Sequence, residues 1–365
     1  MKKAKTKCVA LILASIMLMA GCSKLKGNNV SADVIVSTEE TEISASEEKT
    51  EELSETSENE NADPEDDSYK FEYKQYVASD MFKETMGKDV SDAYRNFIEA
   101  IENGETEFEC ADEDSFDWMM GQYAYNCNPC VAEYVVSGSY SDGKGTFSYT
   151  IPEDEFRQKL EEFEQLVTDI INGAGIKEDD SDLEKALLIY LYMIENYEYD
   201  YVAAESYTVD QLSAYRLFTT GHGICQEIGI GYAYLLMELG IDAAGSGGIG
   251  EDGIGHEWAI VHINDQYYNV DPTFGLGTKT LAYFMMTDDT REFYGGYKVE
   301  DVTKVNHYPL YHDDDYVCPY ICDDDTFPDF GFVEFYDLDH ENNIIYYTSC
   351  ETAEEINSFD FSSYT

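Results

Sequence analysis

Three chemically active side chains follow one another at short intervals in the second half of the chain. Cys225 comes after a glycine-rich turn, His256 lies in a run of alternating residue types, and Asp271 precedes a proline. Thiol, imidazole and carboxylate are the groups of a nucleophile, its base and the residue that orients the base. This order constrains the fold strongly, because one helix and two strands must bring the three groups together.

Cys225 is predicted to lie in the first turn of a buried helix. Gly221 and Gly223 permit a tight turn before it, and Gly240 is a natural end. The N–H groups and dipole at a helix N-terminus favour the thiolate. A buried cysteine without a chemical role is the alternative for this segment alone. Apolar residues recur at helical spacing between these limits, at Ile228, Tyr232, Leu235, Leu236 and Leu239.

His256 and Asp271 are predicted to lie on neighbouring antiparallel strands. Residues 256–263 indicate a strand buried on much of both faces, and residues 267–271 form the returning strand after a short turn. If Asp265-Gln266 is a two-residue turn, the two side chains share a face but are four residues apart along the ladder. That separation is roughly 13 Å at about 3.3 Å per residue. A bulge or a shifted register must then close the gap.

These segments resemble the transglutaminase-like superfamily, whose members share a papain-type Cys-His-Asp arrangement. The resemblance runs from near Ser181 to near Asp289 and implies an α+β fold, with a cysteine-bearing helix packed on an antiparallel sheet. It implies that Cys225 is the nucleophile, His256 the general base and acid, and Asp271 the orienting carboxylate. The matching residues are Tyr199-Asp200, Gly223-Ile224-Cys225, Gly240-Ile241, His256-x-Trp258, Val270-Asp271-Pro272-Thr273 and Tyr283-Phe284-Met285.

Two acidic residues bear on the tuning of this triad. Many relatives carry Gly and Tyr shortly after the cysteine, where this chain has Gln226-Glu227-Ile228. Glu227 would place a negative charge near the thiolate and oppose it, unless the side chain points elsewhere. Glu257, directly after His256, is a second acidic neighbour.

The resemblance implies attack of the Cys225 thiol on a peptide or carboxamide carbonyl, giving a thioester. The backbone N–H of Cys225 is the expected oxyanion donor, with Gln211 and Tyr190 as candidate side-chain partners. Water is the favoured acceptor, since cross-linking needs an amine-binding groove and no segment can be assigned to one. A protein or peptide at the cell surface is the expected substrate. A cross-linking transglutaminase and a non-catalytic surface binding module are the alternatives.

Residues 1–22 are predicted to be a lipoprotein signal peptide. Lysines precede an apolar run that is too short to span a membrane as a lasting helix. Met19-Ala20-Gly21-Cys22 resembles a bacterial lipobox, which implies that Cys22 carries a lipid and anchors the protein outside the cytoplasm on the cell membrane. An ordinary secretory signal with a chance cysteine is the alternative.

The rest of the chain is predicted to form four regions. Residues 23–67 are an acidic, disordered tether, because they are rich in Glu, Ser and Thr and poor in large apolar residues. An N-terminal α+β region at 68–151, the catalytic domain at 152–295 and a β-rich C-terminal extension at 296–365 follow it. Expected elements are helices at 90–102, 153–172 and 181–196, the last with a Ser181–Glu184 capping box, and hairpins around Asp142-Gly143 and between 332–336 and 344–348.

The formal net charge is −54, and only 15 of the 76 acidic residues lie in 31–67. A globule this acidic is not expected to bind nucleic acid or anionic lipid. No cofactor is predicted; calcium is the alternative, at residues 312–315 or 322–325. A third acidic segment, 337–341, lacks the glycine and glutamate of a calcium loop and is better interpreted as a hairpin turn.

Six cysteines remain once Cys8, Cys22 and Cys225 are assigned to the signal, the lipid and catalysis. Outside the cytoplasm they could form disulfides, in any of 15 connectivities, or stay unpaired in the core. Two pairs could instead offer four thiolates to zinc. The six are Cys110, Cys127, Cys130, Cys318, Cys322 and Cys350.

Overall fold

The computed structural model describes residues 69–206, 213–249, 255–295, 302–303, 320–327, 333–349 and 355–362. The chain divides into two compact units, 1–66 and 67–365, and the second holds all described residues. The predicted signal peptide, the whole predicted tether and Cys22 therefore lie outside the described residues. No helix in the described ranges is long and apolar enough to cross a membrane.

The N-terminal region combines short helices with an antiparallel sheet of order β1-β3-β2. Its Asp142-Gly143 turn has positive φ at both residues, as the hairpin prediction requires. The elements are α2 (Asp80–Met86), α3 (Lys88–Asn103), β1 (Glu107–Glu109), α4 (Glu113–Trp118), the π-helix η2 (Met119–Tyr123), α5 (Ala124–Cys127), α6 (Pro129–Tyr134), β2 (Val135–Ser141) and β3 (Lys144–Tyr149).

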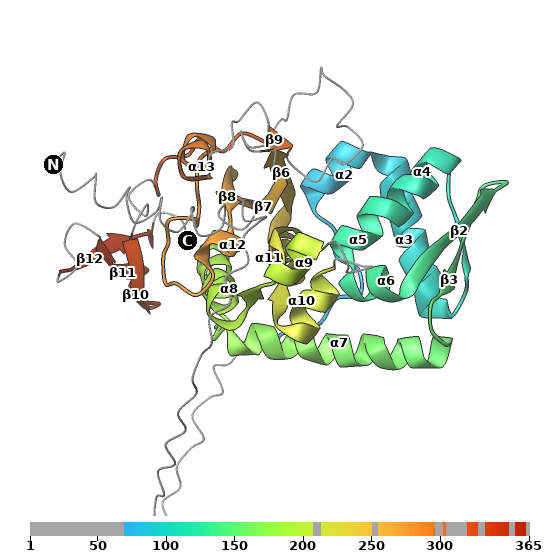
Figure 1. Ribbon diagram of the computed structural model, residues 1–365, viewed down its shortest axis with the longest axis horizontal. Helices are drawn as coiled ribbons and strands as arrows, with labels where there is room; N and C mark the ends of the chain where they lie inside the picture. Colours follow the sequence, from blue (N-terminus) through green and yellow to red (C-terminus); the bar gives the residue numbers. More distant parts are fainter. Residues whose placement is uncertain are drawn as a thin grey trace, which may run out of the picture. The chain divides into compact units, whose positions relative to one another are not determined.

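The central region places helices against a four-stranded antiparallel sheet of order β8-β7-β6-β9 (Figure 1). Its helices are α7 (Glu153–Gly173), α8 (Asp182–Asn196), α9 (Tyr201–Ser206), α10 (Ala214–Thr220), α11 (Cys225–Glu238), α12 (Pro272–Gly275) and α13 (Asp288–Gly295). Its strands are β4 (Glu198–Tyr199), β5 (His222–Gly223), β6 (Asp242–Ile249), β7 (Gly255–Ile263), β8 (Gln266–Val270) and β9 (Val302–Thr303).

Helix α11 is the centre of this region. Its residues from Glu227 to Glu238 are all buried, as expected of a helix that is apolar on most sides. It packs against β6 and β7 and also against α8 and α10. Cys225 is the first residue of the most enclosed helix of this region, so its backbone is held rigidly in place.

Gly229 allows α11 to approach β7 closely. A Cβ at this position would lie 2.9 Å from the Cα of Trp258, closer than real Cβ contacts allow. Gly229 is one helical turn beyond Cys225, and Trp258 is two residues beyond His256. This contact therefore helps to set the distance between the cysteine and the histidine, and a larger residue would push the two elements apart.

The C-terminal residues form a three-stranded antiparallel sheet of order β10-β11-β12. Its strands are β10 (Val333–Asp339), β11 (Ile344–Ser349) and β12 (Ile356–Asp360). The sheet joins the central region through backbone hydrogen bonds, from Leu281 to Val333 and from Phe335 to Lys279. Residues 337–341 end β10 and begin the turn to β11, as the hairpin interpretation predicted.

One hydrophobic core runs through the described part of the chain. It contains Phe97 from α3, Tyr232 from α11 and Ile345 from β11. The fold is α+β, which confirms the predicted class, and helices α3, α7 and α8 lie where the sequence placed them. The predicted region boundaries at 151 and 295 stay predictions, because side chains on both sides of them share this core.

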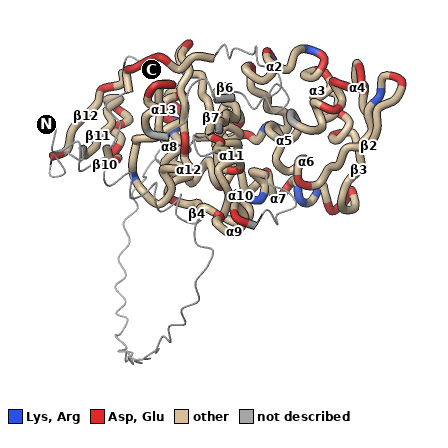
Figure 2. The backbone as a smooth tube through the Cα atoms, turned by 45° about the horizontal axis from the view of Figure 1, so that its top comes forward, with Lys and Arg blue, Asp and Glu red and all other residues tan. Residues whose placement is uncertain are grey.

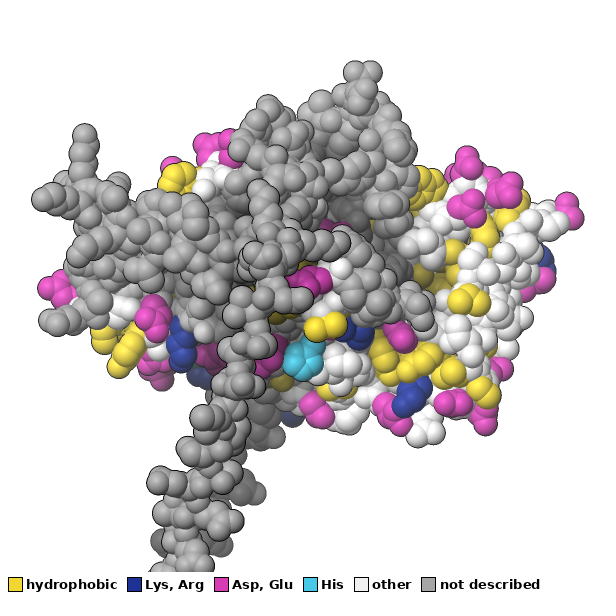
Figure 3. Space-filling model, in the orientation of Figure 1, with side chains coloured by type: hydrophobic (Ala, Val, Ile, Leu, Met, Phe, Trp, Pro, Cys, Tyr) yellow, Lys and Arg dark blue, Asp and Glu magenta, His cyan; other side chains and the backbone are white. Residues whose placement is uncertain are grey.

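Acidic residues are spread over the described elements rather than gathered in one place. Figure 2 shows them along the helices and turns of both the N-terminal and central regions, with few basic residues among them. The face in Figure 3 likewise carries scattered acidic side chains on its described parts. This distribution agrees with a solvated acidic exterior.

Candidate active site

Cys225 begins α11, as predicted. Ile224 is the extended N-cap, and its backbone N–H donates to Oε2 of Glu227 at 2.9 Å, which fixes the first turn. Gly221 has φ of 78°, so the preceding turn requires a glycine. Cys225 is partly exposed, whereas the helix residues after Gln226 are buried.

His256 and Asp271 meet through a register that differs from the expected one. Asn264 and Asp265 form the turn between β7 and β8, with φ of 53° and 61°. Ala259 therefore pairs with Val270. The register is thus shifted by two residues from that of an Asp265-Gln266 turn, and a shifted register was one of the two ways in which the gap could close. The separation of His256 and Asp271 along the ladder becomes about two residues, roughly 7 Å.

The ring of His256 is bound on two sides. Its Nε2 lies 2.7 Å from Oδ2 of Asp271, and its side chain also makes a hydrogen bond with Cys225. Because Nε2 faces the carboxylate, Nδ1 is the nitrogen available to the thiol. Phe274 stacks on the ring at 4.5 Å between centroids. The structure thus brings all three predicted triad residues together.

Electrostatics favour the protonated imidazole. Burial alone would lower the pKa of His256, but the Asp271 carboxylate and the Cys225 sulfur outweigh it and raise the pKa to about 9. A histidine raised in this way stays charged across neutral pH and loses its proton only as the pH passes about 9. An imidazolium beside the sulfur stabilises the thiolate.

Asp271 is fully buried and yet ionised. Burial opposes its charge, but His256 and Arg291 hold its pKa below the ordinary value. Its Oδ1 accepts from the backbone N–H of Thr273 at 3.1 Å. The carboxylate therefore caps α12 with one oxygen and orients the imidazole with the other.

Arg291, on α13, is a site residue that sequence reasoning missed. Its Nη2 lies 3.1 Å from Oδ2 of Asp271, the same oxygen that faces His256. Its guanidinium lies over the Trp258 ring, 4.0 Å from the centroid, and the side chain is buried. The Asp271 carboxylate is therefore compensated by two cationic partners, His256 and Arg291.

Glu227 does not direct its charge at the sulfur. It is fully buried, and Arg216 donates to both of its carboxylate oxygens. Arg216 also donates to Asp200, at 2.8 Å. This ion pair compensates the charge of Glu227, which was expected to oppose the thiolate. Arg216 is also the partner of Asp200, the second residue of the Tyr199-Asp200 segment that resembles the family.

Glu257 points away from the His256 face, since neighbours on a strand alternate. Burial raises the pKa of Glu257 to about 7, against a weaker opposing effect of His256. Near neutral pH it is therefore only partly charged.

Two side chains, those of Tyr190 and Gln211, were candidate hydrogen-bond donors to the oxyanion. The hydroxyl of Tyr190 donates to the Thr280 carbonyl at 3.0 Å, so it is engaged elsewhere. Gln211 lies outside the described residues. The backbone N–H of Cys225, at the first position of α11, stays the expected donor.

The remaining predicted sites are the other cysteines and the acidic segments, and the structure describes only some of them. Cys110, Cys127 and Cys130 are buried with free thiols, so the disulfide alternative is not realised at these three. Cys127 is fully enclosed in the core, where burial raises the pKa of its thiol to about 12. Cys322 is buried as well. Cys318, Cys350 and the acidic segment 312–315 lie outside the described residues.

Residues 170–272 match the family model of the transglutaminase-like superfamily, which confirms the predicted resemblance and encloses the triad. The chain is similar to the crystal structure of a TGase at 15% identity, covering 38% of this chain and 43% of that one with a TM-score of 0.29. It is also similar to a candidate cysteine protease from Cytophaga hutchinsonii at 17% identity, covering 38% and 61% with a TM-score of 0.26. The chain spans less than two thirds of either structure. A search of curated proteins finds no match.

Proposed function

We propose that this chain, with its transglutaminase-like domain, is a surface-anchored cysteine enzyme that cleaves peptide or carboxamide bonds through a thioester. The observation that carries the proposal is the contact chain from Cys225 through His256 to Asp271. The thiol is partly exposed at a helix N-terminus, while the imidazole and the carboxylate are buried behind it. These are the surroundings that a nucleophile and its base require.

In acylation, Sγ of Cys225 attacks the substrate carbonyl carbon and a C–S bond forms. The oxyanion accepts from the backbone N–H of Cys225. His256, protonated at neutral pH because its pKa is about 9, gives its proton to the departing nitrogen as the C–N bond breaks. Asp271 stabilises the imidazolium until that transfer.

In deacylation, the now neutral His256 takes a proton from a water molecule that attacks the thioester carbonyl. The C–S bond breaks, and the carboxylic acid leaves. The sulfur departs as the thiolate beside the new imidazolium, so the resting pair is restored without any other reactant.

Water is favoured over a lysine amine because it needs no binding groove. Cross-linking requires a surface that holds the amine and excludes water. The net charge of −54 should attract lysine-bearing acceptors. That attraction is screened over about 8 Å at physiological salt, so it does not replace a groove.

Free acid is expected to exceed amine adduct when the protein is incubated with Gln-containing peptides and a labelled primary amine at millimolar concentration. Mass spectrometry distinguishes the two products in one sample. Cys225→Ala is the matched control and should form neither. A dominant adduct would make the protein a cross-linking transglutaminase, whereas the absence of both products from wild-type protein across a broad peptide mixture would contradict an enzyme.

The surface location is proposed from the signal-like residues 1–22. Cys22→Ser should abolish incorporation of a fatty-acid analogue and shift the protein out of the detergent phase. Cys8→Ser is a matched control in the same segment and should be labelled like the wild type. Equal labelling of Cys22→Ser would show that the anchor is not at this residue.

A further inference from the structure

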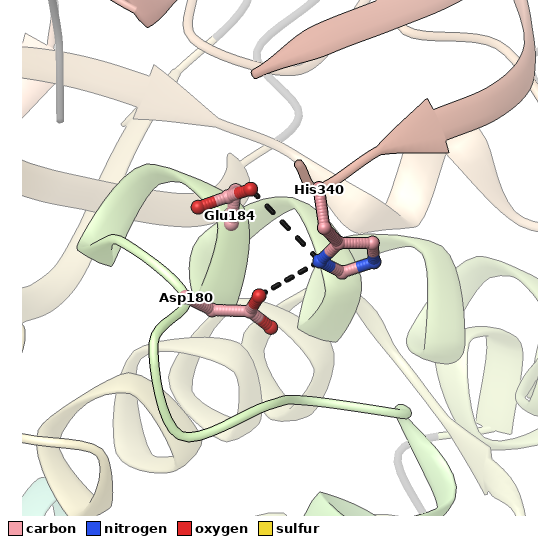
Figure 4. Close-up of side chains that lie close together, drawn as sticks. All are labelled: Asp180, Glu184 and His340. Atoms are coloured by element: carbon pink, nitrogen blue, oxygen red, sulfur yellow. Dashed lines mark hydrogen bonds and ion pairs between the residues drawn. The ribbon is translucent and has the colours of Figure 1, made fainter. Parts of the chain in front are cut away.

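Outside the active site, two carboxylates and an imidazole converge where the C-terminal sheet meets α8 (Figure 4). Glu184 lies in the first turn of α8, Asp180 lies two residues before this helix, and His340 comes from the turn after β10. One atom from each lies within 4.8 Å of the others. Among the described residues, this is the one such group of three potential metal ligands.

Both carboxylates are fixed so that one oxygen stays available. Oδ2 of Asp180 accepts from the backbone N–H of Lys177 at 2.8 Å. Oε2 of Glu184 accepts from the backbone N–H and hydroxyl of Ser181, both at 2.8 Å, as the capping box. The remaining oxygens, Oδ1 and Oε1, face His340. Secondary hydrogen bonds of this kind orient metal ligands.

Glu184 points to a missing partner. The residue is 2% exposed, and its Oε1 has no hydrogen-bond partner among the described residues. Nδ1 of His340 lies 2.7 Å from Oδ1 of Asp180 but 3.9 Å from this Oε1. The His340–Asp180 contact alone therefore explains only part of the cluster, because a buried carboxylate oxygen left without a partner is costly.

We propose that Asp180, Glu184 and His340 bind a transition-metal dication such as Zn²⁺. A point roughly 2–2.5 Å from all three atoms lies between them, so small shifts give ordinary Zn–N and Zn–O distances. Two carboxylates with a neutral imidazole cancel the charge of a dication. Calcium fits less well, because it prefers six to eight oxygen ligands. The ion would fasten the β10–β11 turn to α8, which packs on α11 and α12.

The test measures metal binding by the full chain in a Cys225→Ala background, so that the catalytic thiol cannot capture zinc. One equivalent of Zn²⁺ is expected in competition with a chromophoric chelator, together with a rise in Tm that EDTA reverses. His340→Gln and Glu184→Gln should weaken the Kd by at least about 100-fold, since each removes a direct ligand. Glutamine at 184 keeps the capping box.

His222→Ala is the matched control, because His222 also faces one carboxylate, that of Glu198 at 3.7 Å, on the exposed surface. It should bind zinc like the parent. The site is disproved if the parent lacks the tight equivalent or if folded His340→Gln retains it. Intense thiolate charge-transfer absorption with Co²⁺ in place of Zn²⁺ would also overturn it, by assigning the metal to cysteines.

Discussion

Cys225→Ala and His256→Ala are each expected to lower kcat/KM by on the order of 10⁴-fold or more, and the double variant should lose no more than either alone. The two groups share one proton and one contact, so removing either removes the unit. Asp271→Asn should lose less, because the thiol and imidazole remain. Additive losses would contradict a shared site.

His262→Ala is the matched control for His256→Ala. His262 lies on the same strand and its Nδ1 is 3.8 Å from a carboxylate oxygen of Asp242, but it contacts no thiol of the triad. Its loss should leave kcat/KM close to that of the wild type. An NMR titration adds a direct readout: the pKa of His256, about 9 in the wild type, should fall in Cys225→Ala, because the sulfur contributes to raising it.

The same variants separate an enzyme from a binding module that kept the fold. In the native protein, a small electrophile near neutral pH should label Cys225 first, since Cys110, Cys127 and Cys130 are buried and burial raises the pKa of each. His256→Ala should slow this labelling sharply. Labelling that is no faster than at the buried thiols would favour the module.

The sequence predicted the elements of the site but not their exact alignment. Asn264-Asp265 and Asp265-Gln266 are both polar dipeptides, and either can close a hairpin. The structure uses the former, whose residues adopt positive φ, a conformation that asparagine and aspartate tolerate better than glutamine. Turn chemistry could therefore have decided the register, and with it the approach of His256 to Asp271.

Strand β6 was missed for a different reason. It contains three glycines, which have low strand propensity. It forms because β7 pairs with it along its whole length and α11 covers it. Both are tertiary effects that local patterns do not carry.

The ion pairs that compensate the buried carboxylates could not be predicted from the sequence either. Glu227 looked unfavourable because its partner, Arg216, is on another helix. Arg291 gave no signal at all, since it stands among acidic residues and meets Asp271 only in the folded chain. Residue spacing predicts which side chains are neighbours within one helix or strand. It does not predict which distant cationic side chain pairs with a buried carboxylate.

Arg291→Gln is expected to lower kcat/KM by about 10- to 100-fold, the range found when a partner behind a functional ligand is removed. Without the guanidinium, Asp271 is a buried carboxylate held by His256 and by the backbone N–H groups of Thr273 and Phe274. Unfolding in urea should show a loss on the order of 3 kcal/mol, because a buried pair loses one partner. Activity is compared under conditions where both proteins are folded.

The pH profile distinguishes a positioning role from a structural one. Arg291 holds the pKa of Asp271 down, so its loss should move the acid limb of kcat/KM to higher pH. It also shares Oδ2 with His256; without it the carboxylate charge acts on the imidazole alone, which should raise the pKa of His256 and move the alkaline limb above about 9.

Arg291→Lys keeps the charge but loses the planar contact with Trp258, so it should restore the limbs and part of the rate. Arg157→Gln, which breaks a half-exposed pair with Glu153, is the matched control and should change neither. If Arg291→Gln lost activity with both limbs unmoved, Arg291 would merely support α13. If both limbs move and Arg291→Lys restores them, the charge of Arg291 acts on the thiol–imidazole pair through Asp271.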